Sequence, residues 1–156
     1  MLLLDDSSPG ADVVDKALPP SSATLHDALV QSWPRLAGRV TFVASSLDDF
    51  ELLPTDVVIS SHACGALTDR VLERAVAARA RVAVLPCCHH LTGRVIKGIN
   101  DINDPRALSA WVDGALAIDI GRAIRLQQQG YRIWAQAIPA EITPKNRLLL
   151  GAPART

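Results

Sequence analysis

Short apolar runs recur along the chain and predict strands. The runs at residues 56–60 and 81–85 consist of β-branched and aliphatic side chains without polar residues at alternate positions. This pattern is typical of parallel strands that are covered on both faces of a sheet. Further strands are predicted at residues 11–15, 40–44, 131–138 and 147–150.

In three of the segments between these runs, apolar residues recur with the spacing that is typical of a helix. A helix is predicted from an N-cap at Ser22 to about Trp33, and a second over residues 68–80. A third helical region opens with Asp104 and Pro105 and ends at Gly130, which suits the position after a helix C-terminus. The predicted buried stripe of the first helix contains Leu25, Leu29, Val30 and Trp33, and that of the second contains Val71, Leu72, Ala75 and Val76. The stripe of the third helical region contains Trp111, Leu116, Ile120 and Ile124.

The order of these elements predicts an α/β domain that ends in an antiparallel hairpin with its link at residues 139–146. The strand, helix and strand over residues 56–85 form a right-handed unit, so the loops after both strands should leave the same edge of one sheet. Ligands of open α/β sheets bind at that edge.

Size and charge restrict the setting. The chain has 156 residues and equal numbers of acidic and basic side chains, 16 of each, so no global field attracts it to nucleic acid or to a membrane. No apolar stretch reaches the ~20 residues of a membrane span. Asp5 and Asp6 directly follow Leu2–Leu4, a pattern unlike a secretory signal. The three cysteines, two of them adjacent, favour reduced thiols and a cytoplasmic protein.

Candidate chemistry is concentrated in the two loops after the runs at 56–60 and 81–85. The first reads Ser61-His62-Ala63-Cys64-Gly65 and the second Leu85-Pro86-Cys87-Cys88-His89-His90. One interpretation is an active site in which a histidine acts as general base. A second is a metal site, although adjacent cysteines should point in different directions on an extended chain and the usual Cys-x₂-Cys spacing is absent. A third is packing of small buried thiols.

These two loops resemble a family of S-adenosylmethionine-dependent methyltransferase domains. That family has a His-x-Cys-Gly-x-Leu-[Thr/Ser]-Asp box, matched from His62 to Asp69, and a Pro-Cys-Cys box, matched from Pro86 to Cys88. The string from Cys87 to His90 is similar to one in acceptor-stem tRNA ribose 2′-O-methyltransferases. The resemblance covers residues 13–151 and implies a three-layer Rossmann-like class I methyltransferase sheet, mainly parallel with a C-terminal antiparallel hairpin.

The resemblance also implies roles for particular side chains. Asp15 would hold the ribose of S-adenosylmethionine, and the cofactor would also contact Ser46, Leu47 and Ser61. His62 or His89 would be the base. The candidate catalytic residues are therefore His62, Cys64, Cys88 and His89, and no metal ligand is assigned.

The chain departs from the family at its start. Ten residues precede the predicted strand at 11–15, too few for the family's first strand, glycine-rich turn and helix, and Gly10 is their only glycine. We therefore expect one N-terminally truncated methyltransferase-like domain over residues 1–156, with residues 1–10 an irregular remnant and weak cofactor binding. The alternatives are a non-catalytic remnant that acts as a binding or assembly module, and a small metal-binding protein. The methyl acceptor, a small molecule or an RNA, is not identified.

Several spatial expectations follow. Side chains of the two loops should line one surface, with Asp15 at the same edge of the sheet. One of Cys87 and Cys88 should face the pocket and the other the core. Trp111 and Trp134 should be core anchors, and residues 145–147 a polar turn. A missing first strand would leave an exposed edge, which favours a homodimer.

Overall fold

The computed structural model describes residues 10–89, 108 and 110–154. They fall into two units, residues 1–51 and 52–156, where the sequence predicts a single domain. Each unit has its own sheet, of two and four strands respectively.

The first unit has the predicted order of strand, helix and strand. It contains β1 (Ala11–Asp15), α1 (Ser21–Ser32), the 3₁₀ helix η1 (Pro34–Leu36) and β2 (Val40–Ala44). β1 and β2 pair in parallel, with Asp15 opposite Ala44, so both strands end at the same edge. α1 begins one residue before the predicted cap, with Pro20 at the N-cap position and no side-chain cap.

The apolar stripe predicted for α1 is not buried. Leu25 is 59% exposed and Trp33 44% exposed, and none of the residues of α1 is buried. α1 contacts β2 through the His26 ring, which lies edge-on to Phe42 with 5.8 Å between ring centres. A sheet of two strands is too small to cover a helix stripe, so the periodicity predicted the helix correctly and its burial wrongly.

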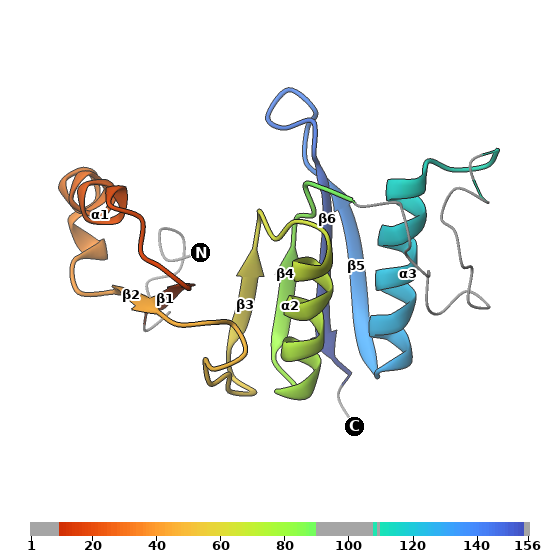
Figure 1. Cartoon of the computed structure of the whole chain (residues 1–156), viewed down its shortest axis with the longest axis horizontal. Coiled ribbons are helices and arrows are strands. Elements are labelled where there is room, and N and C mark those ends of the chain that lie inside the picture. The colour runs from red at the N-terminus through yellow and green to blue at the C-terminus, as the bar shows by residue number, and fades with distance from the viewer. Residues whose placement is uncertain (1–9, 90–107, 109, 155–156) are drawn as a thin grey trace. The chain divides into compact units, whose positions relative to one another are not determined.

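The second unit forms the four-stranded sheet, in the order β3-β4-β6-β5 (Figure 1). Its elements along the chain are β3 (Val57–Ser60), α2 (Ala66–Ala77), β4 (Arg81–Val84), α3 (Gly114–Gln128), β5 (Tyr131–Ala137) and β6 (Arg147–Pro153).

Strand directions in this sheet are mixed. β3 and β4 are parallel, as the strand-helix-strand pattern predicts. The C-terminal hairpin of β5 and β6 is antiparallel, which confirms that prediction, and β6 also pairs antiparallel with β4. β3, β4 and β5 therefore run in one direction and β6 alone runs against them, which agrees with the predicted parallel strands and C-terminal hairpin. Both antiparallel pairings involve β6, because it lies between β4 and β5.

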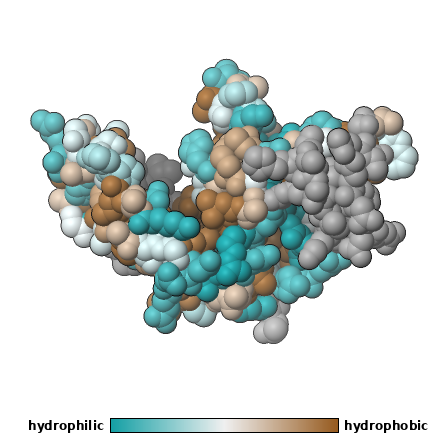
Figure 2. Space-filling view, in the orientation of Figure 1, coloured by the Kyte–Doolittle hydropathy of each residue, from teal (hydrophilic) through white to brown (hydrophobic). Residues whose placement is uncertain are grey.

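The two described helices of the second unit, α2 and α3, pack on one face of the sheet (Figure 1). Val82 and Val84 of β4 and Leu149 of β6 are buried on that face. Gly151 belongs to it too, and a Cβ there would lie only 3.2–3.3 Å from side-chain atoms of Tyr131, Val82 and Leu126, so a larger residue would crowd the packing against α3. Figure 2 shows hydrophilic residues on the outward side of α2.

The ends of α3 have clear causes. The Asp113 side chain caps it by accepting a hydrogen bond from the Leu116 N–H at 2.9 Å. Gly130 has a φ of +78° just after the helix, as predicted for this glycine. The predicted start at Asp104 and Pro105 lies outside the described residues.

The two tryptophans of this unit are not core anchors, so that prediction is wrong. Trp111 is 84% exposed because α3 begins after it, at Gly114, and its buried stripe does not extend back to residue 111. Trp134 is 44% exposed because it lies opposite Leu150, on the face of the sheet away from the helices. Among the described residues, no helix has the length and apolar character to cross a membrane.

Candidate functional site

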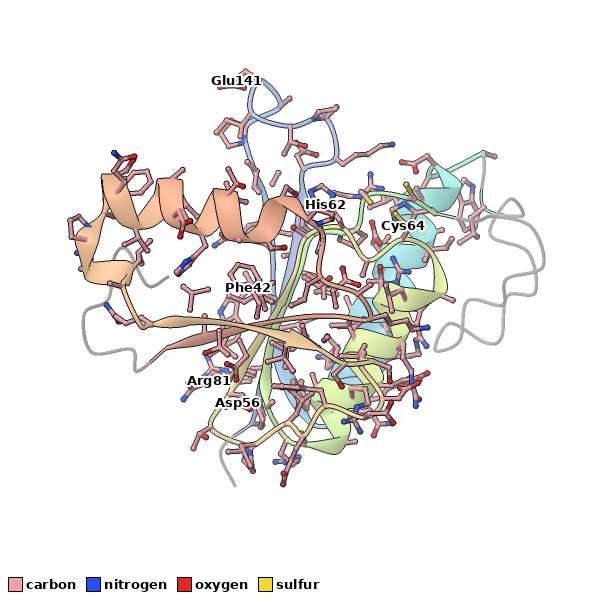
Figure 3. All side chains as sticks on the ribbon, turned by 60° about the vertical axis from the view of Figure 1, so that its left-hand side comes forward. Phe42, Asp56, His62, Cys64, Arg81 and Glu141 are labelled. Carbon is pink, nitrogen blue, oxygen red and sulfur yellow. The ribbon has the colours of Figure 1, made fainter. Side chains whose placement is uncertain are left out.

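Two loops meet at the carboxyl ends of β3 and β4. The Gly65 N–H donates to the Cys88 carbonyl at 3.0 Å, and the Leu85 N–H donates to the Ser60 carbonyl at 2.8 Å. Gly65 has a φ of +59° at the start of α2, a conformation that favours glycine. Figure 3 shows His62 and Cys64 at this end of the unit, opposite the end that carries Asp56 and Arg81.

The three cysteines converge in these loops. The Cys64 and Cys87 sulfurs are 3.1 Å apart, the Cys87 and Cys88 sulfurs are 3.7 Å apart, and all three lie within 4.8 Å of one another. The prediction that Cys87 and Cys88 point in opposite directions is therefore wrong. β4 ends at Val84, so these two residues follow a loop backbone on which side chains no longer alternate.

The thiols differ in acidity. Hydrogen bonding to Cys87 and then to Cys88 raises the pKa of Cys64 to about 12. Hydrogen bonding with Cys64 and then with His62 lowers the pKa of Cys87 to about 7. Cys87 is therefore the thiol that ionises first, with Cys64 as its hydrogen-bond donor.

The two histidines of the predicted site have different surroundings. His62 is exposed and hydrogen-bonds to Cys87. The His89 side chain is only 5% exposed, and its Nε2 lies 2.8 Å from the Asp119 Oδ1. The structure thus leaves His62 accessible and holds His89 against α3.

Asp119 anchors a network of ion pairs. Besides His89, it accepts hydrogen bonds from Arg122 at 3.0 Å and from Arg147 at 2.9 Å. Burial by itself would raise the pKa of Asp119, but the hydrogen bonds with His89 and Arg147 outweigh it and hold that pKa below its ordinary value.

Arg122 is fully buried and links the network to the loop after β3. It donates to the Gly65 carbonyl at 3.0 Å and to both carboxylate oxygens of Asp69, at 2.9 and 3.3 Å. Arg125 also donates to Asp69, at 2.7 Å. The loop that carries Cys64 is thereby fixed to α3.

Sequence reasoning missed Asp119 and Arg122. A signal was present, because Arg122 lies between Ile118 and Leu126 at four-residue spacing, on the buried stripe of α3. A buried arginine requires acidic partners, and Asp119 is one helical turn away. The sequence did not show that Asp69 would be another.

Three of the residues predicted to bind the cofactor lie together in the first unit. Asp15 is exposed at the end of β1, and the Ser45 N–H donates to its carbonyl at 2.9 Å, which places Ser46 and Leu47 just beyond the end of β2. The Ser46 hydroxyl donates to Asp49 at 2.7 Å. Ser61 is exposed in the second unit, directly after β3.

The hairpin link is more structured than a solvated turn. The Asn146 side chain donates to the Ile138 carbonyl at 2.8 Å, and Arg147 bonds to Asp119. The Lys145 N–H donates to the Thr143 hydroxyl at 3.3 Å.

Comparison with known proteins relates this chain to methyl transfer. Residues 20–94 match the sequence model of a family described as a methyltransferase domain. A curated protein from Xenopus laevis, named glutathione S-transferase C-terminal domain-containing protein, is 24% identical over 143 residues. That alignment covers 74% of this chain but 23% of the other, so the chain spans about a quarter of that relative.

The matched region includes both site loops, from Ser61 to Gly65 and from Leu85 to His89. It ends shortly after the Pro-Cys-Cys box, before α3. The match supports a methyltransferase domain family for this chain.

Proposed function

We propose that the chain is an S-adenosylmethionine-dependent methyltransferase domain, with His62 as the base that serves the methyl acceptor. The observation that carries this proposal is the match over residues 20–94, which includes the loops of His62 and Cys88. Those loops follow adjacent parallel strands, where α/β folds bind ligands.

The first unit suits the adenosine end of the cofactor. Asp15 is the last residue of β1 and Ser46 follows β2, which pairs with β1, so a carboxylate and a polar loop lie at neighbouring strand ends. An exposed carboxylate there can accept hydrogen bonds from the two ribose hydroxyls. Leu47 adds an apolar contact for the adenine ring.

The second unit suits the acceptor. S-adenosylmethionine, when bound, supplies an electrophilic methyl group, so the protein has to orient the acceptor and remove its proton. His62 is exposed, and an imidazole nitrogen can accept a proton, which fits a general base. His89 is already paired with Asp119, so its role is to position the loop of Cys88. Cys64 and Cys88, both exposed, border the acceptor side.

Methyl transfer itself can be tested with tritium-labelled cofactor at high concentration. One reaction would contain total RNA and another a small-molecule cell filtrate, because the acceptor class is open. We expect label in one fraction and a loss of about 10²–10⁴-fold in rate for His62→Gln. Glu141→Gln, in the hairpin link, is the matched control and should transfer at the normal rate.

Two results would contradict the proposal. Equal rates for the wild type and His62→Gln would exclude His62 as the base. Absence of transfer to both fractions at saturating cofactor would instead support the non-catalytic binding module.

A further inference from the structure

The proposed methyl transfer does not explain why the three sulfurs lie in one cluster. The chain has only three cysteines, and the fold brings all of them from two loops into one cluster. Cys64 and Cys88 are exposed, and Cys87 is half-buried. Cysteines used simply as small apolar residues are among the most buried of all side chains, so packing does not explain this arrangement.

The spacing of the sulfurs suits a single metal ion. A zinc–sulfur bond is about 2.3 Å long, so two sulfurs of a zinc tetrahedron lie about 3.8 Å apart. The observed separations of 3.1 and 3.7 Å, with a third of at most 4.8 Å, are close to that value. Small rotations of the side chains would equalise them.

The backbone already holds the ligands in place. The hydrogen bond from Gly65 to the Cys88 carbonyl joins the two loops. The Thr68 hydroxyl donates to the Ala63 carbonyl, and Arg122 to the Gly65 carbonyl, so both neighbours of Cys64 are fixed. A preorganised ligand set avoids the cost of ordering loops when the metal binds.

We propose that Cys64, Cys87 and Cys88 bind one zinc ion through three thiolates. Sulfur ligands select thiophilic ions over magnesium or calcium. Each thiol releases its proton to solvent as its sulfur coordinates the ion. Three protein ligands leave the fourth position of the tetrahedron open, as in catalytic zinc sites, and His62 is the titratable side chain that bonds to Cys87 beside it.

Cobalt substitution tests this directly, and it does not depend on methyl transfer. The full-length reduced chain, stripped with a chelator, would be titrated with Co²⁺ and then with Zn²⁺. We expect one Co²⁺ per chain, with sulfur-to-cobalt charge-transfer absorption that disappears when zinc displaces it. X-ray absorption at the zinc edge of the wild-type protein should report three sulfur ligands at about 2.3 Å.

Variants identify the ligands. Cys64→Ser, Cys87→Ser and Cys88→Ser should each weaken zinc binding by at least about tenfold, the lower end of what the loss of an outer-shell partner costs. Asp56→Asn is the control, because Asp56 lies at the opposite end of the unit and its replacement should leave zinc affinity unchanged (Figure 3).

The competing explanation is a disulfide between Cys64 and Cys87. Thiols protected by zinc become reactive after chelation, whereas thiols in a disulfide become reactive only after reduction. The proposal is overturned if the reduced wild-type chain gives no charge-transfer band and no zinc–sulfur scattering, or if Cys88→Ser binds zinc as the wild type does.

Discussion

Cys87 shows how neighbouring residues set the chemistry of one side chain. It is half-buried in the loop after β4 and hydrogen-bonds to both Cys64 and His62, and together they lower its pKa to about 7. Cys64, its nearest sulfur neighbour, has its pKa raised to about 12 by hydrogen bonds with Cys87 and then with Cys88. In the reduced, metal-free protein, Cys87 therefore ionises near neutral pH, well before Cys64 does.

Alkylation should report this difference. In the reduced, metal-free chain, the rate of Cys87 modification by iodoacetamide should rise as the pH passes about 7, while Cys64 stays unreactive until strongly alkaline pH. Peptide mass spectrometry across a pH series measures both. His62→Ala should move the Cys87 midpoint upward, since one stabilising hydrogen bond is lost. Coincident midpoints for Cys64 and Cys87 would show that the contacts do not perturb either thiol.

Arg122 is the residue whose loss should harm stability most clearly. Arg122→Met leaves Asp69 and Asp119, which are only 16% and 12% exposed, without a shared partner. Removal of one partner from a buried ion pair costs about 3–5 kcal/mol when the other charge is left alone. Asp69 keeps Arg125 and Asp119 keeps Arg147, so urea denaturation of the full chain should show a loss at the lower end of that range.

The control is Arg70→Met, because Arg70 pairs with Glu73 at 3.3 Å on the exposed side of α2. This change should alter the free energy of unfolding by no more than about 0.5 kcal/mol. Equal losses of unfolding free energy in the two variants would mean that the buried ion pairs of Arg122 stabilise the fold no more than the exposed pair of Arg70 does.

At the scale of elements, the local pattern of apolar and polar residues predicted well which strands and helices form and where they lie. The predicted strand at residues 40–44 coincides with β2, and that at 81–85 with β4 to within one residue. Val71, Leu72 and Ala75 are buried in α2, as their spacing indicates. Such features depend on neighbours in sequence, so the sequence contains them.

Contacts between residues that are distant in sequence could not be predicted from local pattern. The periodicity of α1 does not reveal whether anything covers Leu25, and a predicted helix from residue 105 does not reveal that α3 starts at Gly114. The convergence of Cys87 and Cys88 depends on a loop backbone that alternation rules do not describe. The proximity of the two site loops was predictable, because it depends only on adjacent parallel strands.

The link between α3 and the site loops should weaken in acid. Asp119 has a lower pKa in the folded state than the ordinary value of 3.8, so its ion pairs stabilise the fold above that value and are lost as the pH falls through the folded pKa. Asp119→Asn should lower stability at neutral pH but flatten the decline below about pH 4. Urea midpoints measured from pH 7 to pH 2 provide the test, and parallel curves for the two proteins would contradict it.

At the scale of the whole molecule, the division into two sheets is what the sequence least revealed. Alternating strands and helices predicted one continuous sheet, because local pattern does not report which strands pair. Among the described residues, β1 pairs with β2 alone, and β3 has a single neighbour, β4. On the outer edge of β1 and of β3, no described strand is paired.

The outer edge of β3 should promote self-association. Val57 and Ile59 on this strand are 37% and 60% exposed, and an unpaired apolar edge is a template for another strand. A second copy could pair there antiparallel, as a two-fold dimer requires. Light scattering should show a dimer that increases with concentration, and Ile59→Lys should restore the monomer by placing a charge on the edge strand. Ile142→Lys is the control, because it places the same charge at an isoleucine of the hairpin link that is 72% exposed. This variant should still form the dimer. A monomer at every concentration would mean that this edge does not pair between copies.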